Sequence, residues 1–144
     1  MGRRAAKTAA LAIALGAVVW ALVALSAPSD RVLAEGEFHQ VAHKGSGRAA
    51  IVRQDDGRAL VRLTGVATAF RPDLEVLLIS APDAAENETV KQSESLSLGS
   101  FEPGRTDYRV PGDIEVERFH AVTIWSRKYQ VNFTTAPLAW REGR

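Results

Sequence analysis

Hydrophobic positions follow two different patterns along this 144-residue chain. The first pattern is an uncharged run of 20 residues, from Thr8 to Ala27, which follows three positive charges. A helix of that length spans about 30 Å, the thickness of the hydrocarbon core of a bilayer. The run therefore predicts one membrane-spanning anchor, with its charged end in the cytoplasm and the following domain outside.

A cleaved signal peptide is the alternative for the same run. The apolar region of a signal peptide is usually about 7–15 residues long, which is shorter than the run here. Ala24-Leu25-Ser26 nevertheless offers small residues at the two positions that a cleavage site requires. On this alternative the domain is secreted or periplasmic and is not attached to the membrane through residues 8–27.

The second pattern begins near Glu35 and consists of short apolar runs separated by turn residues. Asp56-Gly57 is a strong hairpin-turn pair, and residues 83–92 form a polar interruption that predicts a long solvated loop with room for one helical turn. The runs that predict strands are 49–52, 58–66, 74–80, 94–101, 107–110, 119–125 and 129–135.

No segment after residue 34 sustains a helical period with caps at both ends. Short strands with turns between them predict an all-β fold, an antiparallel β-sandwich, preceded by one transmembrane or signal helix. We expect residues 1–34 to form the anchor or signal segment with a short linker, 35–140 to form the domain and 141–144 to form a tail. The stretch APLAWREGR, from residue 136, is expected to contain no strand.

Residues 121–126 read as one strand in which side chains alternate between two faces. Val122, Ile124 and Ser126 share one face, and Ala121 and Trp125 lie on the other. Ser126 therefore continues an apolar face, where serine is an unusual choice. We expect its hydroxyl to be buried and paired with a backbone carbonyl.

Charge and cysteine content exclude several classes of function. The first 34 residues carry a net charge of +3 and the remainder a net charge of −2, so the domain has no electrostatic footprint for nucleic acid. The chain has no cysteine, which excludes disulfides, thiolate chemistry and iron–sulfur clusters.

Five segments in this order resemble the DM thirteen domain family, also called the electron-transfer DM thirteen domain. This domain occurs beside DOMON domains in some animal proteins and alone in bacterial ones. The resemblance covers Glu35 to Leu138, and it implies the family's fold. The segments are GEFHQVAHKGSGRAAIV, RPDLEVLLI, LGSFEPGRTDYRVP, HAVTIWS and YQVNFTTAPL.

The resemblance also implies a particular position for redox chemistry. The family's proposed redox role rests on a cysteine directly after the tryptophan of the late strand. Trp125 matches that tryptophan, and Ser126 stands where the cysteine is expected. Because a serine hydroxyl neither binds metal as a thiolate does nor has an accessible redox couple, thiol-dependent electron transfer does not carry over.

Imidazoles suit zinc, copper or haem iron, so the three histidines are candidate metal ligands. His39 and His43 share a strand face, and a site would need the strand of His120 to lie beside theirs. Glu37 and Asp73 are carboxylates that would assist. The structural alternative has His43 hydrogen-bonded near the KGSG turn and His39 solvated.

Two further features bear on function. Arg71-Pro72-Asp73 predicts a turn whose carboxylate accepts nearby backbone N–H groups. Trp125 and Tyr129 are candidates for an exposed aromatic interface, unless a second sheet covers Trp125.

No G-x-S-x-G elbow or other catalytic constellation is present, and no cofactor is evident from the sequence. The leading hypothesis is therefore a non-enzymatic extracytoplasmic module, anchored in the membrane, that binds an envelope protein or a small ligand. The alternative is a cell-envelope redox protein that uses a bound cofactor in place of the thiol.

Overall fold

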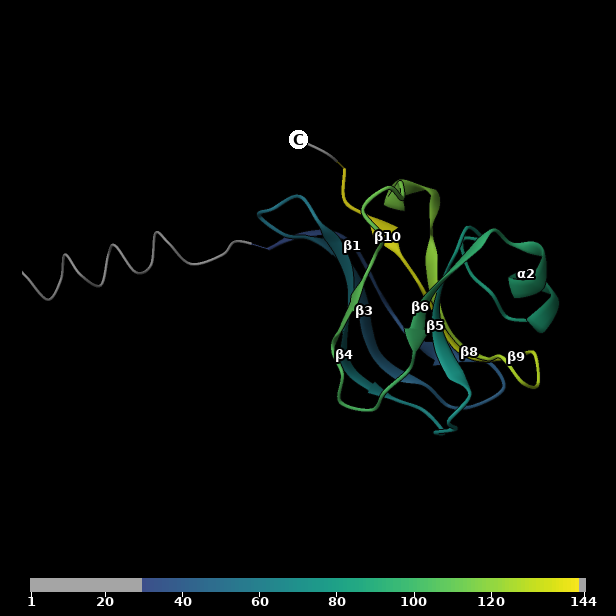
Figure 1. The fold of residues 1–144 in the computed structure, drawn as a ribbon. Coiled ribbons are helices and arrows are strands. Elements are labelled where there is room, and N and C mark those ends of the chain that lie inside the picture. The colour runs from purple at the N-terminus through teal and green to yellow at the C-terminus, as the bar shows by residue number, and fades with distance from the viewer. Residues whose placement is uncertain (1–29, 143–144) are drawn as a thin grey trace, which may run out of the picture.

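Two antiparallel five-stranded sheets pack face to face in the computed structural model, which describes residues 30–142 (Figure 1). The predicted all-β sandwich is thus confirmed. The first sheet has the order β10 (Ala139–Trp140), β1 (Arg31–Glu37), β3 (Ser46–Arg53), β4 (Ala59–Ala67) and β7 (Asp107–Arg109). The second has the order β2 (His39–Gln40), β9 (Val131–Pro137), β8 (Ala121–Ser126), β5 (Leu74–Ile79) and β6 (Ser95–Ser100).

The helix expected at residues 8–27 lies outside the described residues. Within residues 30–142 the helical elements are α2 (Asn87–Gln92) and the 3-10 turn η1 (Val116–Arg118). Among these described residues, no helix has the length and apolar character that crossing a membrane requires.

Strands β5 and β8 lie at the centre of the second sheet and are buried on both faces. Leu74, Val76 and Leu78 face the core between the sheets. Leu77 and Ile79 face outward, into a second apolar cluster. Burial on both faces explains why β5 reads as a nearly continuous apolar run and not as an alternating one.

The second cluster is closed by the segment between β5 and β6. Ala84 and Val90, the latter in α2, pack against the outward face of β5 and β8 and cover Trp125. Residues 83–92 therefore form a cover for the second sheet, not only the solvated loop expected from their polar sequence.

Strands lie nearer to both chain ends than the sequence predicts. Strand β1 begins at Arg31 and not near Glu35. The stretch from residue 136 was expected to contain no strand, but its residues 139–140 form β10, in which Trp140 lies opposite Ala34. Strand β9 also extends into this stretch and ends at Pro137. A strand of two residues has no periodicity of its own, so only its pairing with β1 reveals it.

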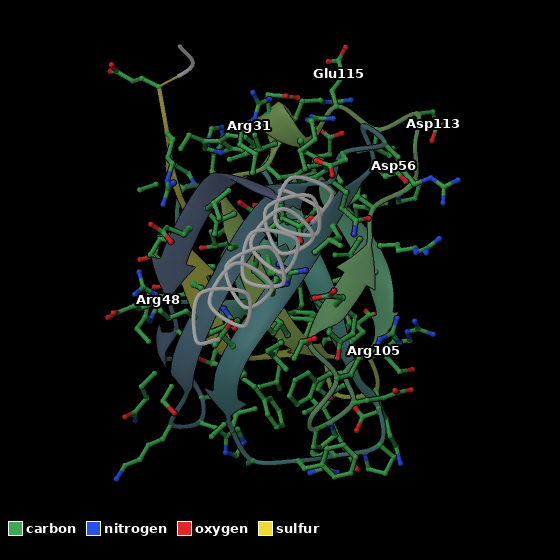
Figure 2. The ribbon with its side chains drawn as sticks, turned by 90° about the vertical axis from the view of Figure 1, so that its left-hand side faces the viewer. Arg31, Arg48, Asp56, Arg105, Asp113 and Glu115 are labelled. Carbon is green, nitrogen blue, oxygen red and sulfur yellow. The ribbon has the colours of Figure 1, made fainter. Side chains whose placement is uncertain are left out.

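The loops divide between two ends of the sandwich. Arg31 pairs with Arg53 beside the β3–β4 turn, and Figure 2 shows Arg31, Asp56, Asp113 and Glu115 at this end. We call the opposite end the distal end. It is formed by the β2–β3 loop (41–45), the β4–β5 loop (68–73), the β6–β7 loop (101–106) and the β8–β9 turn (127–130).

Candidate functional site

Ser126 is the last residue of β8 and is fully buried. It lies opposite Leu74 of the core, on the face of Val122 and Ile124, as the alternation along the strand predicts. Its hydroxyl donates a short hydrogen bond to Asp73 Oδ2 and accepts one from the Tyr129 N–H at 3.2 Å. The expected backbone carbonyl partner is therefore wrong, and a carboxylate takes its place.

Asp73 joins the β4–β5 loop to the β8–β9 turn. Its carboxylate accepts the Ser126 hydroxyl and the Lys128 N–H, the latter at 3.3 Å, and lies 3.6 Å from the Arg71 guanidinium. The Ser126 hydrogen bond, above all, lowers the pKa of Asp73 below its usual value. The carboxylate does accept a backbone N–H as predicted, but from a turn that lies far from it in the sequence.

Glu75 is a second carboxylate beside this turn, and the sequence analysis missed it because it sits inside an apolar strand. It is 8% exposed and lies opposite Trp125. Its Oε2 accepts hydrogen bonds from Ser97 Oγ at 2.8 Å and Arg127 Nη2 at 2.7 Å. A nearly buried charge needs such partners, so the pair with Arg127 fixes the β8–β9 turn from its other side.

Tyr129 projects from the same turn and is 52% exposed. The Arg71 guanidinium lies 4.5 Å from the centroid of its ring, and the Lys128 amine lies 5.3 Å from it. Both distances fall within the range of cation–π contacts. Phe70, in the neighbouring loop, is 56% exposed, so the distal end presents aromatic rings among cations.

Trp125 does not share this surface. It is 4% exposed and packs with Leu77 and Val90 in the second apolar cluster. The sequence left open whether a second sheet covers Trp125 or the side chain is exposed, and the segment containing α2 covers it. Of the two aromatic candidates, only Tyr129 is available to a partner.

A groove of about 250 Å³ runs between the β4–β5 loop and the β8–β9 turn. Its two carboxylates are already matched, because Asp73 lies near Arg71 and Glu75 pairs with Arg127. The Ser126 hydroxyl donates to a carboxylate whose pKa is lowered, and such a carboxylate is a weak general base. The lining residues are Pro72, Asp73, Leu74, Glu75, Ser100, Arg127 and Lys128.

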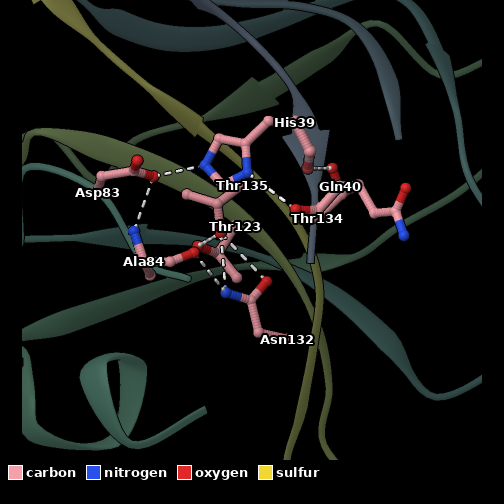
Figure 3. Close-up of polar contacts among 8 residues, drawn as sticks. All are labelled: His39, Gln40, Asp83, Ala84, Thr123, Asn132, Thr134 and Thr135. Carbon is pink, nitrogen blue, oxygen red and sulfur yellow. Dashed lines mark hydrogen bonds and ion pairs between the residues drawn. The ribbon is translucent and has the colours of Figure 1, made fainter. Parts of the chain in front are cut away.

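The three histidines occupy three separate environments. His39 Nε2 lies 2.6 Å from Asp83 Oδ1 and its Nδ1 lies 3.0 Å from the Gln40 carbonyl (Figure 3). The His43 ring packs against Phe133 with 4.1 Å between the ring centroids and a tilt of 41°. His120 is partly buried at the start of β8. Within residues 30–142, no three His, Cys, Asp or Glu side chains are grouped as a set of metal ligands. His39 therefore contacts a carboxylate and is not merely solvated. The ring of His43 packs against Phe133.

The Asp83 hydrogen bond raises the pKa of His39 above 6.5, and the Gln40 carbonyl adds to this effect. Both ring nitrogens face acceptors, and an imidazole can donate from both only when it is protonated. His39 therefore favours the charged form and ties the start of the β5–β6 segment to the edge strand β2.

A buried polar network lies beside this ion pair and was also missed from the sequence (Figure 3). Asn132 Nδ2 donates to Thr135 Oγ1 at 2.9 Å and to the Ala84 carbonyl at 3.2 Å, and Thr135 Oγ1 lies 2.9 Å from Thr123 Oγ1. The signal in the sequence is the polar composition of NFTT within an otherwise buried strand. The network holds the covering segment on the second sheet.

The comparison with protein families agrees with this geometry. The family described as Electron transfer DM13 matches residues 37–138, a range that contains Ser126, Asp73 and both loops of the distal groove. The resemblance recognised in the sequence is thereby confirmed. No curated protein and no solved structure gave a significant match.

Proposed function

Because this chain belongs to the electron transfer DM13 family but carries serine where the resemblance implies a cysteine, we propose that it is a non-enzymatic binding module. Residues 8–27 hold it at the outer face of a membrane, and its distal end meets an envelope partner. The observation that carries this proposal is the environment of Ser126. Its hydroxyl is buried and forms hydrogen bonds with the Asp73 carboxylate and the Tyr129 N–H.

The bonds of Ser126 support a structural role. They hold the β8–β9 turn in the conformation that exposes Tyr129, with Gln130 at a positive φ of 55° closing the turn. The position to which the resemblance assigns the family's proposed redox role serves here to shape a surface loop. Tyrosine and arginine side chains are enriched at protein interfaces, and Tyr129 beside Arg71 supplies both.

The position of residue 30 supports the orientation. Residue 30 lies at the end of the sandwich opposite the β8–β9 turn, beside the β3–β4 turn. A helix at residues 8–27 with its positive leader in the cytoplasm would hold the end of the sandwich that carries residue 30 against the membrane and direct Tyr129 away from it.

The location is tested by protease treatment of cells whose outer envelope is opened, with a tag at the C-terminus. We expect the tag to be cleaved while cytoplasmic markers stay intact, and the rest of the chain to stay with the membrane. A protected tag would contradict the orientation. Release of the domain into the soluble fraction would favour the signal peptide instead.

The binding surface is tested by a photo-crosslinking phenylalanine analogue placed at Tyr129 in the native host. The matched control carries the analogue at Arg48, an exposed residue of β3 (Figure 2). We expect a discrete adduct from position 129 that is lost when Arg71→Ala is added, and none from position 48. Equal adducts from both positions, or none from 129, would reject the distal end as the interface.

The family description favours a second candidate function, electron transfer through a bound cofactor. The described residues contain no cysteine and no grouped His, Asp or Glu side chains, so their donor set does not fit a metal centre. This candidate requires a cofactor held without such ligands, which a redox-dependent absorption band would reveal.

A further inference from the structure

A hollow of about 550 Å³ lies at the distal end, between the β2–β3 loop and the end of β4. Its volume is within the range of small-molecule sites. The partner surface around Tyr129 does not include any of its lining residues. These are Gln40, Lys44, Gly45, Ser46, Ala67, Thr68 and Ala69.

One wall of the hollow is held rigidly against β9. A Cβ atom on Gly45 would lie 1.9 Å from Thr134 Oγ1, so only glycine allows the loop to approach this closely. The His43 N–H donates to the Phe133 carbonyl at 3.1 Å, and the His43 ring stacks on Phe133. The wall is therefore formed before any ligand arrives, which reduces the entropic cost of binding.

The opposite wall is fixed by another close approach. Gly47 has a positive φ of 98°, and a Cβ there would lie 2.6 Å from the Gly65 carbonyl oxygen. This contact accompanies the irregular pairing of β3 and β4, where Ser46 lies opposite Ala67. Ser46 and Ala67 thus face the hollow from a fixed junction.

Several polar groups around the hollow have no protein partner. In the part of the chain that the structure describes, Thr68 Oγ1 is the buried side-chain polar atom without a hydrogen bond. Lys44 forms no ion pair there, and the Gln40 and Ser46 side chains form no hydrogen bond there. By contrast, Arg71, Arg127 and Arg105 at the same end each lie near a carboxylate.

The chemistry of the lining selects the ligand. Lys44 supplies a positive charge, Gln40 and Ser46 supply neutral donors, and no carboxylate lines the hollow. Ala67 and Ala69 supply small apolar surfaces.

We propose that this hollow binds a small organic anion, with a carboxylate directed at Lys44 and a short apolar body against Ala67 and Ala69. The charge fixes the orientation of the ligand, and the alanine side chains contact its apolar body, the usual division of roles in such sites. The site is independent of the partner surface at Tyr129, so either proposal can stand without the other.

The test is a titration of the full chain, in a nonionic detergent, with sodium butyrate, monitored by the backbone amide signals of Gly45, Ser46 and Ala69. We expect saturable shifts of these signals, with Gly57 at the other end unaffected. Butanol, which lacks the charge, and inorganic phosphate, which lacks the apolar body, are expected to bind much more weakly.

Two variants make the test specific. Lys44→Gln is expected to weaken butyrate binding about fivefold, through loss of one partly exposed charge interaction. The matched control is Lys91→Gln on α2, which pairs with Glu88 away from the hollow and is expected to leave binding unchanged. Absence of saturable shifts, equal weakening by both variants, or equal binding of butyrate and butanol or phosphate would each overturn the proposal.

Discussion

At the scale of single residues, Ser126 shows how one hydroxyl organises a surface. It donates to Asp73 of one loop and accepts from the Tyr129 N–H of its own turn, so two loops share one buried atom. The same hydrogen bond lowers the pKa of Asp73 and keeps it charged beside Arg71. The turn that exposes Tyr129 therefore depends on a residue that is itself inaccessible.

Ser126→Ala should destabilise the fold by about 1–3 kcal/mol, because it leaves the Tyr129 N–H and the Asp73 carboxylate without their partner. Ser126→Cys should cost less, within about 1.5 kcal/mol, because it conserves the shape of the side chain and a thiol remains a weak donor. Urea denaturation of the full chain measures both values. An Ala variant as stable as the wild type would show that the Ser126 hydrogen bonds contribute nothing.

The thiol introduced by Ser126→Cys should react slowly with thiol reagents until the chain unfolds. Burial and the neighbouring Asp73 carboxylate both disfavour the reactive thiolate. A cysteine placed at the exposed position of Tyr129 is the control and should react quickly. Rapid native-state labelling at position 126 would show that this position is open to solvent.

His39 carries the pH dependence that the structure predicts. The Asp83 hydrogen bond raises its pKa above 6.5, so NMR titration of its ring should give a midpoint above that value, and Asp83→Asn should lower it. A raised folded-state pKa means that the stabilisation is complete below about pH 6.5 and is lost as the pH rises through the folded-state value.

The gain in stability from this pair is small, at most about 1 kcal/mol, because both side chains are partly exposed to solvent. Denaturation of wild type and Asp83→Asn should therefore differ slightly at pH 5.5 and converge well above the His39 midpoint. A difference that grows with rising pH would contradict the assignment of a charged His39.

At the scale of elements, the second sheet is stabilised by a segment whose polar sequence does not predict this role. Residues 83–92 are mostly polar, yet Ala84 and Val90 seal Trp125 and the outward face of β5. The contact is supported by the Asn132 network, which binds the Ala84 carbonyl, and by the Asn87 side chain, which accepts the Asn132 N–H at 2.8 Å.

Asn132→Ala should destabilise the domain by about 2–4 kcal/mol, since it removes the Nδ2 donor of the Ala84 carbonyl and leaves the buried Thr135 hydroxyl with Thr123 as its remaining side-chain partner. In hydrogen-exchange measurements, the backbone amides of residues 84–92 should lose their protection first. Lys91→Ala, on the exposed side of α2, is the control and should stay within about 0.5 kcal/mol of wild type. Uniform loss of protection across both sheets would mean that the segment does not open separately.

The sequence predicts the strands well where a local pattern exists. The apolar runs predict β5 and β8, and the alternation along β8 places Val122 and Trp125 on opposite faces, as the structure does. Asp56-Gly57 forms a hairpin turn, in which Gly57 has a φ of 83°. Strand β10 was missed because its only signal is the pairing of Trp140 with Ala34 in β1.

The candidate site was only partly predictable for a related reason. Burial of Ser126 follows from alternation along one strand, but its partner Asp73 lies 53 residues away in the sequence. Glu75 and Arg127 are likewise joined only by the packing of β5 beside β8. Contacts between side chains of distant segments leave no local pattern in the sequence. For the same reason, the sequence could not show that the three histidines lie apart in the fold.

At the scale of the whole molecule, the two ends of the sandwich differ in character. The end opposite the distal end carries residue 30 and the β3–β4 turn, and the distal end carries exposed aromatic rings, cations and the hollow beside Lys44. On our account the family scaffold is kept and its redox position is converted into a support for the distal loops. The central claim is therefore that this protein binds without transferring electrons.

The most direct test is a redox difference spectrum of the full chain purified from its native host, recorded after dithionite and after ferricyanide. We expect no visible band that changes between the two states, and no electrons taken up per chain in a coulometric titration. A reversible band that co-purifies in stoichiometric amount with the chain would contradict the account and establish electron transfer through a bound cofactor.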